Sequence, residues 1–134
     1  MGEIRYLLLT EVIELHAEVM ELMGWSPAPL RSEALLESAI MKAQAVAFYG
    51  GADLAMQAVT LAVGISQNQP FLDGNKRTAY VAMFAFLEQN GWTVKAGPYD
   101  VAKQLIAVAE REGSLEEATG AFAAWLRERL VTRH

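Results

Sequence analysis

The chain has 134 residues, of which 53% are hydrophobic and 20% charged, with a formal net charge of -5 at pH 7. This composition is too apolar for a disordered protein and the length suits one core, so we expect a single domain over residues 1–134. The acidic balance argues against direct nucleic-acid binding, and the lack of cysteine excludes a disulfide framework. The apolar run 79–87 is far shorter than the ~20 residues that span a bilayer, and no secretory signal is visible. We therefore expect a cytoplasmic, bacterial-type protein that does not enter a membrane.

Apolar residues recur at helical spacing through nearly the whole chain. In the first half, Thr10 is expected to cap a helix that Gly24 ends. Ser32 is expected to cap a second helix and Asp53 to open a third, rich in small apolar residues. Residues 49–52 separate these two helices and contain two glycines, which indicates a loop.

The second half predicts three more helices. The first, 74–89, is apolar on every side, which indicates a central helix surrounded by others. A proline suits the first turn of a helix over 98–111, and a capping box at Ser114 begins a last helix over about 115–129.

Two short segments, 4–8 and 92–95, have extended character but cannot build a substantial sheet. We therefore expect an all-α fold, a compact bundle of about six helices.

The most informative segment is 69–78, with the sequence QPFLDGNKRT, just before the apolar helix. Backbone amides in the first turn of a helix have no intrahelical partners and attract anions, and here they belong to Gly74, Asn75, Lys76 and Arg77. The glycine lets a ligand approach the backbone, while the lysine and arginine add an ammonium and a planar guanidinium that suit phosphate. Asp73 would repel phosphate unless Mg²⁺ lies between them, so the segment indicates a Mg²⁺–nucleotide site.

A plainer interpretation is a solvated turn in which Asp73 caps the helix and the cations face water. Lys76 and Arg77 weigh against it, because two cations in a first turn oppose the helix dipole.

The segment resembles the loop signature of the Fic/Doc family, through Phe71, Asp73, Asn75 and Arg77, and similarity of the Doc (death-on-curing) type extends from about residue 6 to residue 92. The resemblance implies that Asp73 ligates Mg²⁺ and that residues 74–77 bind the phosphates of ATP. Members that transfer AMP have a second glycine where this chain has Lys76, and a lysine there is the Doc pattern, in which ATP offers its γ-phosphate. The implied activity is that of a protein Ser/Thr kinase toxin that phosphorylates a threonine of elongation factor Tu.

The departure from the family is Gln69, which stands where the family has a histidine acting as general base. Glutamine has no usable basicity near neutral pH, and loss of a positioned base costs about 10²–10⁴ in rate. We therefore expect this form to be inactive, whether the glutamine was introduced to silence a toxin or is a natural degeneration. AMP transfer, or a degenerate Fic/Doc module that binds without catalysis, are the alternatives.

Other residues carry weaker expectations. His16 is expected to be a structural histidine rather than a replacement base, and Arg31 either to help bind phosphate or to pair with a carboxylate. The resemblance also implies that residues 48–51 form a flap that docks the target. The alternative is that they form an ordinary flexible loop. It further implies an antitoxin of the Phd type, with a disordered segment that folds into a helix on binding.

Overall fold

In the computed structural model, which describes residues 3–26 and 29–133, the chain folds into six helices and two short strands. The all-α prediction is confirmed, because the strands form only a small two-stranded sheet. No helix within the described residues combines the length and the apolar character needed to cross a bilayer. The elements are α1 (Leu9–Leu22), α2 (Glu33–Gly50), α3 (Leu54–Asn68), α4 (Asn75–Gln89), β1 (Trp92–Val94), α5 (Pro98–Ala109), α6 (Leu115–Arg127) and β2 (Leu130–Thr132).

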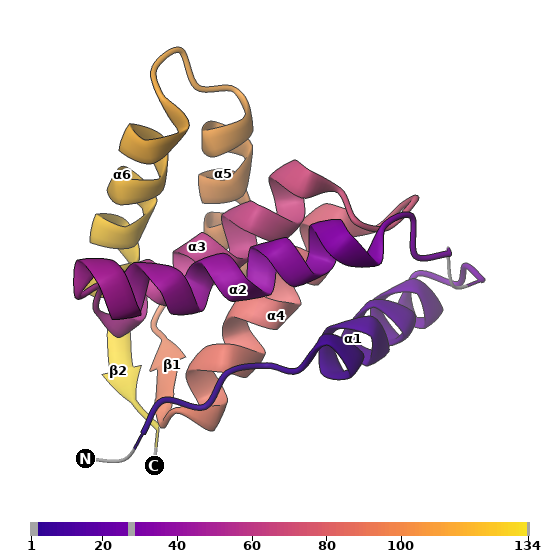
Figure 1. Cartoon of the computed structure of the whole chain (residues 1–134), viewed down its shortest axis with the longest axis horizontal. Coiled ribbons are helices and arrows are strands. Elements are labelled where there is room, and N and C mark those ends of the chain that lie inside the picture. Colours follow the sequence, from indigo (N-terminus) through magenta and orange to yellow (C-terminus); the bar gives the residue numbers. More distant parts are fainter. Residues whose placement is uncertain (1–2, 27–28, 134) are drawn as a thin grey trace.

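The centre of the bundle is α3, which packs against α2, α4, α5 and α6. Small residues make this possible, since a Cβ added at Gly64 would lie only 2.8 Å from the Cβ of Ala39 on α2. The apolar helix α4 is surrounded by other elements, as expected, since it packs against α1, α3, α5 and β1 and is largely buried. Figure 1 shows α5 and α6 as a pair on the side of the bundle away from α1.

Three predicted helix starts are confirmed by side-chain caps. Ser32 Oγ accepts the amide of Leu35 at 3.1 Å, and Ser114 Oγ accepts the amide of Glu117 at 3.0 Å. Asp53 caps α3 in the same way. These caps could be read from sequence because each involves only neighbours along the chain.

Helix α1 begins two residues before its predicted start, since Thr10 lies inside the helix and Leu8 is the N-cap. The side chain of Glu11 reaches back and accepts the amide of Leu8 at 2.8 Å. This is one half of a capping box, and it stabilises the helix start without a polar residue at the cap itself.

The loop expected at 49–52 begins two residues later, because α2 continues through Gly50 and ends at Gly51 in a left-handed conformation. Phe48 and Tyr49 are therefore exposed side chains on the last helical turn rather than members of a flexible loop or an extended flap.

Differences at the other end of the chain are small. Helices α5 and α6 end at Ala109 and Arg127, two residues before the predicted ends. The chain then forms β2, which pairs antiparallel with β1 and was not predicted. The segment 4–8 forms no strand; the backbone of Arg5 instead bonds to the side chains of Gln89 and Asn90.

Candidate active site

The segment between α3 and α4 is held in place by the connector that precedes α2. The carbonyl of Pro70 accepts the amides of Arg31 at 2.6 Å and Ser32 at 3.0 Å. In return, the amide of Leu72 donates to the carbonyl of Pro29 at 3.2 Å. The two segments thus run side by side like two short strands, which fixes the path of residues 70–72.

Arg31 has a structural role at this junction that differs from both roles considered from the sequence. Its Nε donates to the carbonyl of Gln69 at 2.8 Å, and its Nη2 donates to the carbonyl of Asn68, also at 2.8 Å. A cation that satisfies the last carbonyls of a helix also interacts favourably with the helix dipole. Arg31 therefore holds the end of α3.

Gln69 itself ends α3 in the left-handed conformation, with φ of 48°. It is the sole residue other than glycine with positive φ in the described part of the chain. The left-handed conformation costs a residue with a Cβ about 1–2 kcal/mol. Such backbone strain is often found at functional sites. The two bonds from Arg31 help to hold this strained residue.

His16 on α1 lies directly against the loop, which nothing in the sequence indicates. Its ring is buried, with 2% exposed, and stacks on the ring of Phe71 with 3.7 Å between centroids and 3° between planes. Its Nε2 lies 2.9 Å from the carbonyl oxygen of Asp73, which fixes that nitrogen as the donor. The structural interpretation of His16 is confirmed, because the ring is buried and its Nε2 is engaged with backbone.

Gly74 is required by its surroundings as well as by its backbone. Its φ is +78°, and a Cβ at this position would lie 2.8 Å from Sδ of Met20 and 3.6 Å from the ring of His16. Helix α1 thus presses closely on the start of α4.

Asn75 uses its side chain to close the loop rather than to face a ligand. Its Oδ1 accepts the amide of Phe71 at 3.0 Å, and its Nδ2 donates to the carbonyl of Phe71 at 2.8 Å. Only its backbone amide is left for an anion.

Three of the four predicted amides are available at the start of α4. The amide of Gly74 is not, because it donates to Oδ1 of Asp73 at 2.8 Å. The amides of Asn75, Lys76 and Arg77 have no hydrogen-bond partner within residues 3–26 and 29–133. The side chains of Lys76 and Arg77 are exposed, and neither forms an ion pair with another described residue. An acidic protein thus carries a local cluster of unpaired positive charge at a helix N-terminus, which favours anion binding.

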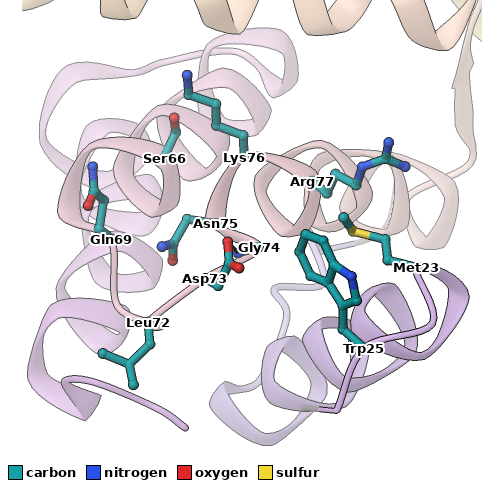
Figure 2. A pocket seen from close by; sticks show the side chains of 10 residues that line it. All are labelled: Met23, Trp25, Ser66, Gln69, Leu72, Asp73, Gly74, Asn75, Lys76 and Arg77. Carbon is teal, nitrogen blue, oxygen red and sulfur yellow. Dashed lines mark hydrogen bonds between the residues drawn. The ribbon is translucent and has the colours of Figure 1, made fainter. Parts of the chain in front are cut away.

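A cavity of about 360 Å³ brings these groups together, a volume within the range of about 300–1,000 Å³ typical of small-molecule sites. Figure 2 shows Gln69 and Trp25 on opposite sides of Asp73, with Lys76 and Arg77 above it in this view. The cavity is lined by Met23, Trp25, Ser66, Gln69, Leu72, Asp73, Gly74, Asn75, Lys76 and Arg77. All six predicted site residues therefore face one space.

The proposed flap does not line this cavity. Residues 49–51 instead border a second cavity of about 1,210 Å³ between α2, α3 and α6. None of residues 69–78 lines that second cavity.

The carboxylate of Asp73 has one oxygen that is free to contact a ligand in the cavity. Oδ1 accepts the amide of Gly74, whereas Oδ2 has no partner within the described residues and the exposed side chain lines the cavity. In the part of the chain that the structure describes, no group of three His, Cys, Asp or Glu side chains is placed to hold a metal ion. Mg²⁺ is commonly held by one or two carboxylates together with substrate phosphates and water, so one carboxylate beside a phosphate site fits this ion.

Comparison with known proteins agrees with the loop geometry. No curated protein matches the sequence. The family model described as Fic/DOC family matches residues 6–87, which includes α1 to α3, the loop and most of α4. Members of this family are typically transferases. The chain belongs to the Fic/DOC family.

Proposed function

We propose that this chain is a Doc-type toxin whose loop is built to transfer the γ-phosphate of ATP to a hydroxyl group of a translation factor. The observation that carries the proposal is the single cavity shared by the free amides at the start of α4, the unpaired Lys76 and Arg77, the carboxylate of Asp73 and Gln69. Asp73 would hold Mg²⁺ at this site, and the ion would supply charge neutralisation for the phosphates.

Each of the chain's own residues has a distinct task in this reaction. The amides of residues 75–77 would hold the phosphate oxygens, and Lys76 and Arg77 would stabilise the negative charge on the transferring group. The target hydroxyl oxygen would form a bond to the γ-phosphorus while the bond to the β-phosphate oxygen breaks, which releases ADP. The hydroxyl proton needs an acceptor, and Gln69 at the rim of the cavity provides none at neutral pH.

The chain as it stands is therefore proposed to bind nucleotide without efficient transfer. The proposed target is the threonine of elongation factor Tu that Doc-type proteins modify. Lys76, in place of the second glycine of AMP-transferring members, favours phosphate over AMP as the transferred group.

A second candidate function is a binding module without catalysis. Gln69 favours it directly, because the candidate base position lacks a base while Asp73, Lys76, Arg77 and the free amides at the start of α4 line the cavity. Under either function we propose a Phd-type antitoxin as partner, with a segment that becomes helical when it binds.

The test uses Gln69→His, with Gln69→Asn as the matched control. Asparagine and histidine both tolerate the left-handed conformation, but only histidine is basic near neutral pH. Each variant is incubated with Mg²⁺, ATP and purified elongation factor Tu, and the intact mass of the factor is measured. A gain of one phosphate with Gln69→His alone supports the kinase, whereas a gain of one AMP would overturn it in favour of AMP transfer. An unchanged mass with both variants, although ATP binds, would favour the binding module.

A further inference from the structure

The two sides of the cavity carry different side chains. In Figure 2, Ser66, Gln69 and Lys76 lie on one side, and Met23 and Trp25 at the end of α1 lie on the other, next to Arg77. The indole of Trp25 lies beside Met23 and faces the loop in this view. A ligand that fills the whole cavity would therefore meet both the cations at the start of α4 and the indole of Trp25.

Trp25 is held in position by the backbone that follows α1. Its amide donates to the carbonyl of Met20 at 2.9 Å, and Gly24 with φ of +74° turns the chain before it. The side chain is 49% exposed, and its ring has no aromatic or cationic partner within the described residues. By contrast, Trp125 packs near Phe122 and carries the guanidinium of Arg129 over its ring at 4.4 Å. A half-exposed indole without an aromatic or cationic partner among the described residues thus forms part of the cavity wall.

A buried hydroxyl on the opposite side of the cavity is independent support for a ligand. Ser66 is 5% exposed, and its Oγ has no hydrogen-bond partner in the part of the chain that the structure describes. A serine in a helix can usually donate to a carbonyl one turn earlier, but this one does not. Leaving a buried polar group unpaired is unfavourable, so a group that enters the cavity and accepts from Ser66 would be stabilised there.

We propose that Trp25 is the base-stacking residue of the nucleotide site, with the flat ring of the base on the indole and the phosphates at the start of α4. This proposal rests on the proposed function and adds a determinant of ligand choice to it. Stacking of a base on an aromatic side chain is favourable for every base, so Trp25 adds affinity for nucleotides over inorganic polyphosphates rather than for one base over another.

The test compares Mg²⁺–ATP with Mg²⁺–tripolyphosphate, which has three linked phosphates without the base and the ribose. Isothermal titration calorimetry is run on the unmodified chain, Trp25→Ala and Trp25→Phe, with circular dichroism to confirm folding. We expect the unmodified chain to bind ATP about tenfold more tightly than tripolyphosphate, in line with the range for base–aromatic stacking. Trp25→Ala should abolish this difference without changing the affinity for tripolyphosphate, and Trp25→Phe should keep most of it.

Two results would overturn the assignment while leaving the proposed function intact. In the first result, the unmodified chain binds ATP and tripolyphosphate with equal affinity, and Lys76→Ala loses the binding of both ligands. This would mean that the base is not bound. A preference for ATP that survives Trp25→Ala would place the base elsewhere. If neither ligand binds the unmodified chain, the proposed function fails together with this inference.

Tryptophan fluorescence gives an independent readout. Quenching by ATP should disappear in Trp25→Phe and persist in Trp125→Phe, because among the described residues Trp25 is the only tryptophan that lines the cavity. Quenching that persists in Trp25→Phe would contradict the proposal.

Discussion

The imidazole of His16 lies flat on the ring of Phe71, with 3.7 Å between the centroids, while its Nε2 reaches the carbonyl of Asp73 at 2.9 Å. One buried side chain on α1 thus contacts two residues of the loop. This contact explains how the first helix determines the path of a segment more than fifty residues away in the sequence.

Substitutions at His16 separate the stacking from the hydrogen bond. We expect His16→Ala to lower the free energy of unfolding by about 3–5 kcal/mol, since it leaves a cavity beside Phe71 and an unpaired carbonyl. His16→Phe keeps an aromatic ring but lacks the donor, so it should cost only about 1–3 kcal/mol. Urea unfolding followed by circular dichroism measures both values, and equal losses for the two variants would contradict the importance of stacking.

Gly74 offers a prediction with a matched control. Gly74→Ala introduces a left-handed alanine and a methyl group 2.8 Å from Sδ of Met20, whereas Gly24→Ala has a similar φ and open space around it. We expect Gly24→Ala to cost about 1–2 kcal/mol from the backbone alone, and Gly74→Ala to cost more. Thermal unfolding of both variants gives the comparison. A smaller loss for Gly74→Ala than for Gly24→Ala would show that α1 does not press on the loop.

The strained conformation of Gln69 predicts that glycine is more stable there. Gln69→Gly should raise the free energy of unfolding by about 1 kcal/mol, because glycine adopts positive φ at little steric cost. Gln69→Ala, which keeps the strain, is the control for loss of the side chain and should give no such gain. An equal gain in the free energy of unfolding in both variants would mean that the gain comes from removing the side chain rather than from relieving backbone strain.

We expect the free energy of unfolding to depend on pH through the ionisation of Asp53. The hydrogen bond from Arg127 is the main cause that lowers the pKa of Asp53, and the amide of Met56 lowers it further. The folded state therefore holds fewer protons than the unfolded state, so the stabilisation is present above the ordinary aspartate value of about 3.9 and is lost as the pH falls through the lower folded pKa.

Asp53→Asn tests this dependence, because it keeps an oxygen that can cap α3 but removes the charge. The pair is about half exposed and should contribute at most about 1 kcal/mol. The difference in unfolding free energy between the parent chain and Asp53→Asn should shrink between about pH 6 and pH 3. A difference that stays constant over this range would exclude the ion pair with Arg127 as its source.

The helix starts and the position of the loop could be predicted from the sequence because the contacts that determine them are local. Ser32, Asp53 and Ser114 cap helices through bonds to amides three residues away, and the loop residues Asp73 to Arg77 lie at a helix start because of their immediate neighbours.

Features that depend on contacts between distant segments could not be predicted from the sequence. The position of His16 against Phe71, the bonds from Arg31 to the end of α3 and the pairing of β2 with β1 all join residues far apart in the sequence. The small residues of α3 were visible, but that they make it the central helix depends on the close approach of α2 at Gly64.

The most direct measurement is the rate of phosphate transfer to elongation factor Tu at saturating Mg²⁺–ATP, in Gln69→His and in Gln69→Asn. If the loop is a complete phosphate site that lacks only its base, Gln69→His should be faster by about 10²–10⁴, with the same affinity for ATP in both variants. Equal rates at equal ATP affinity would contradict the claim that position 69 holds the missing base.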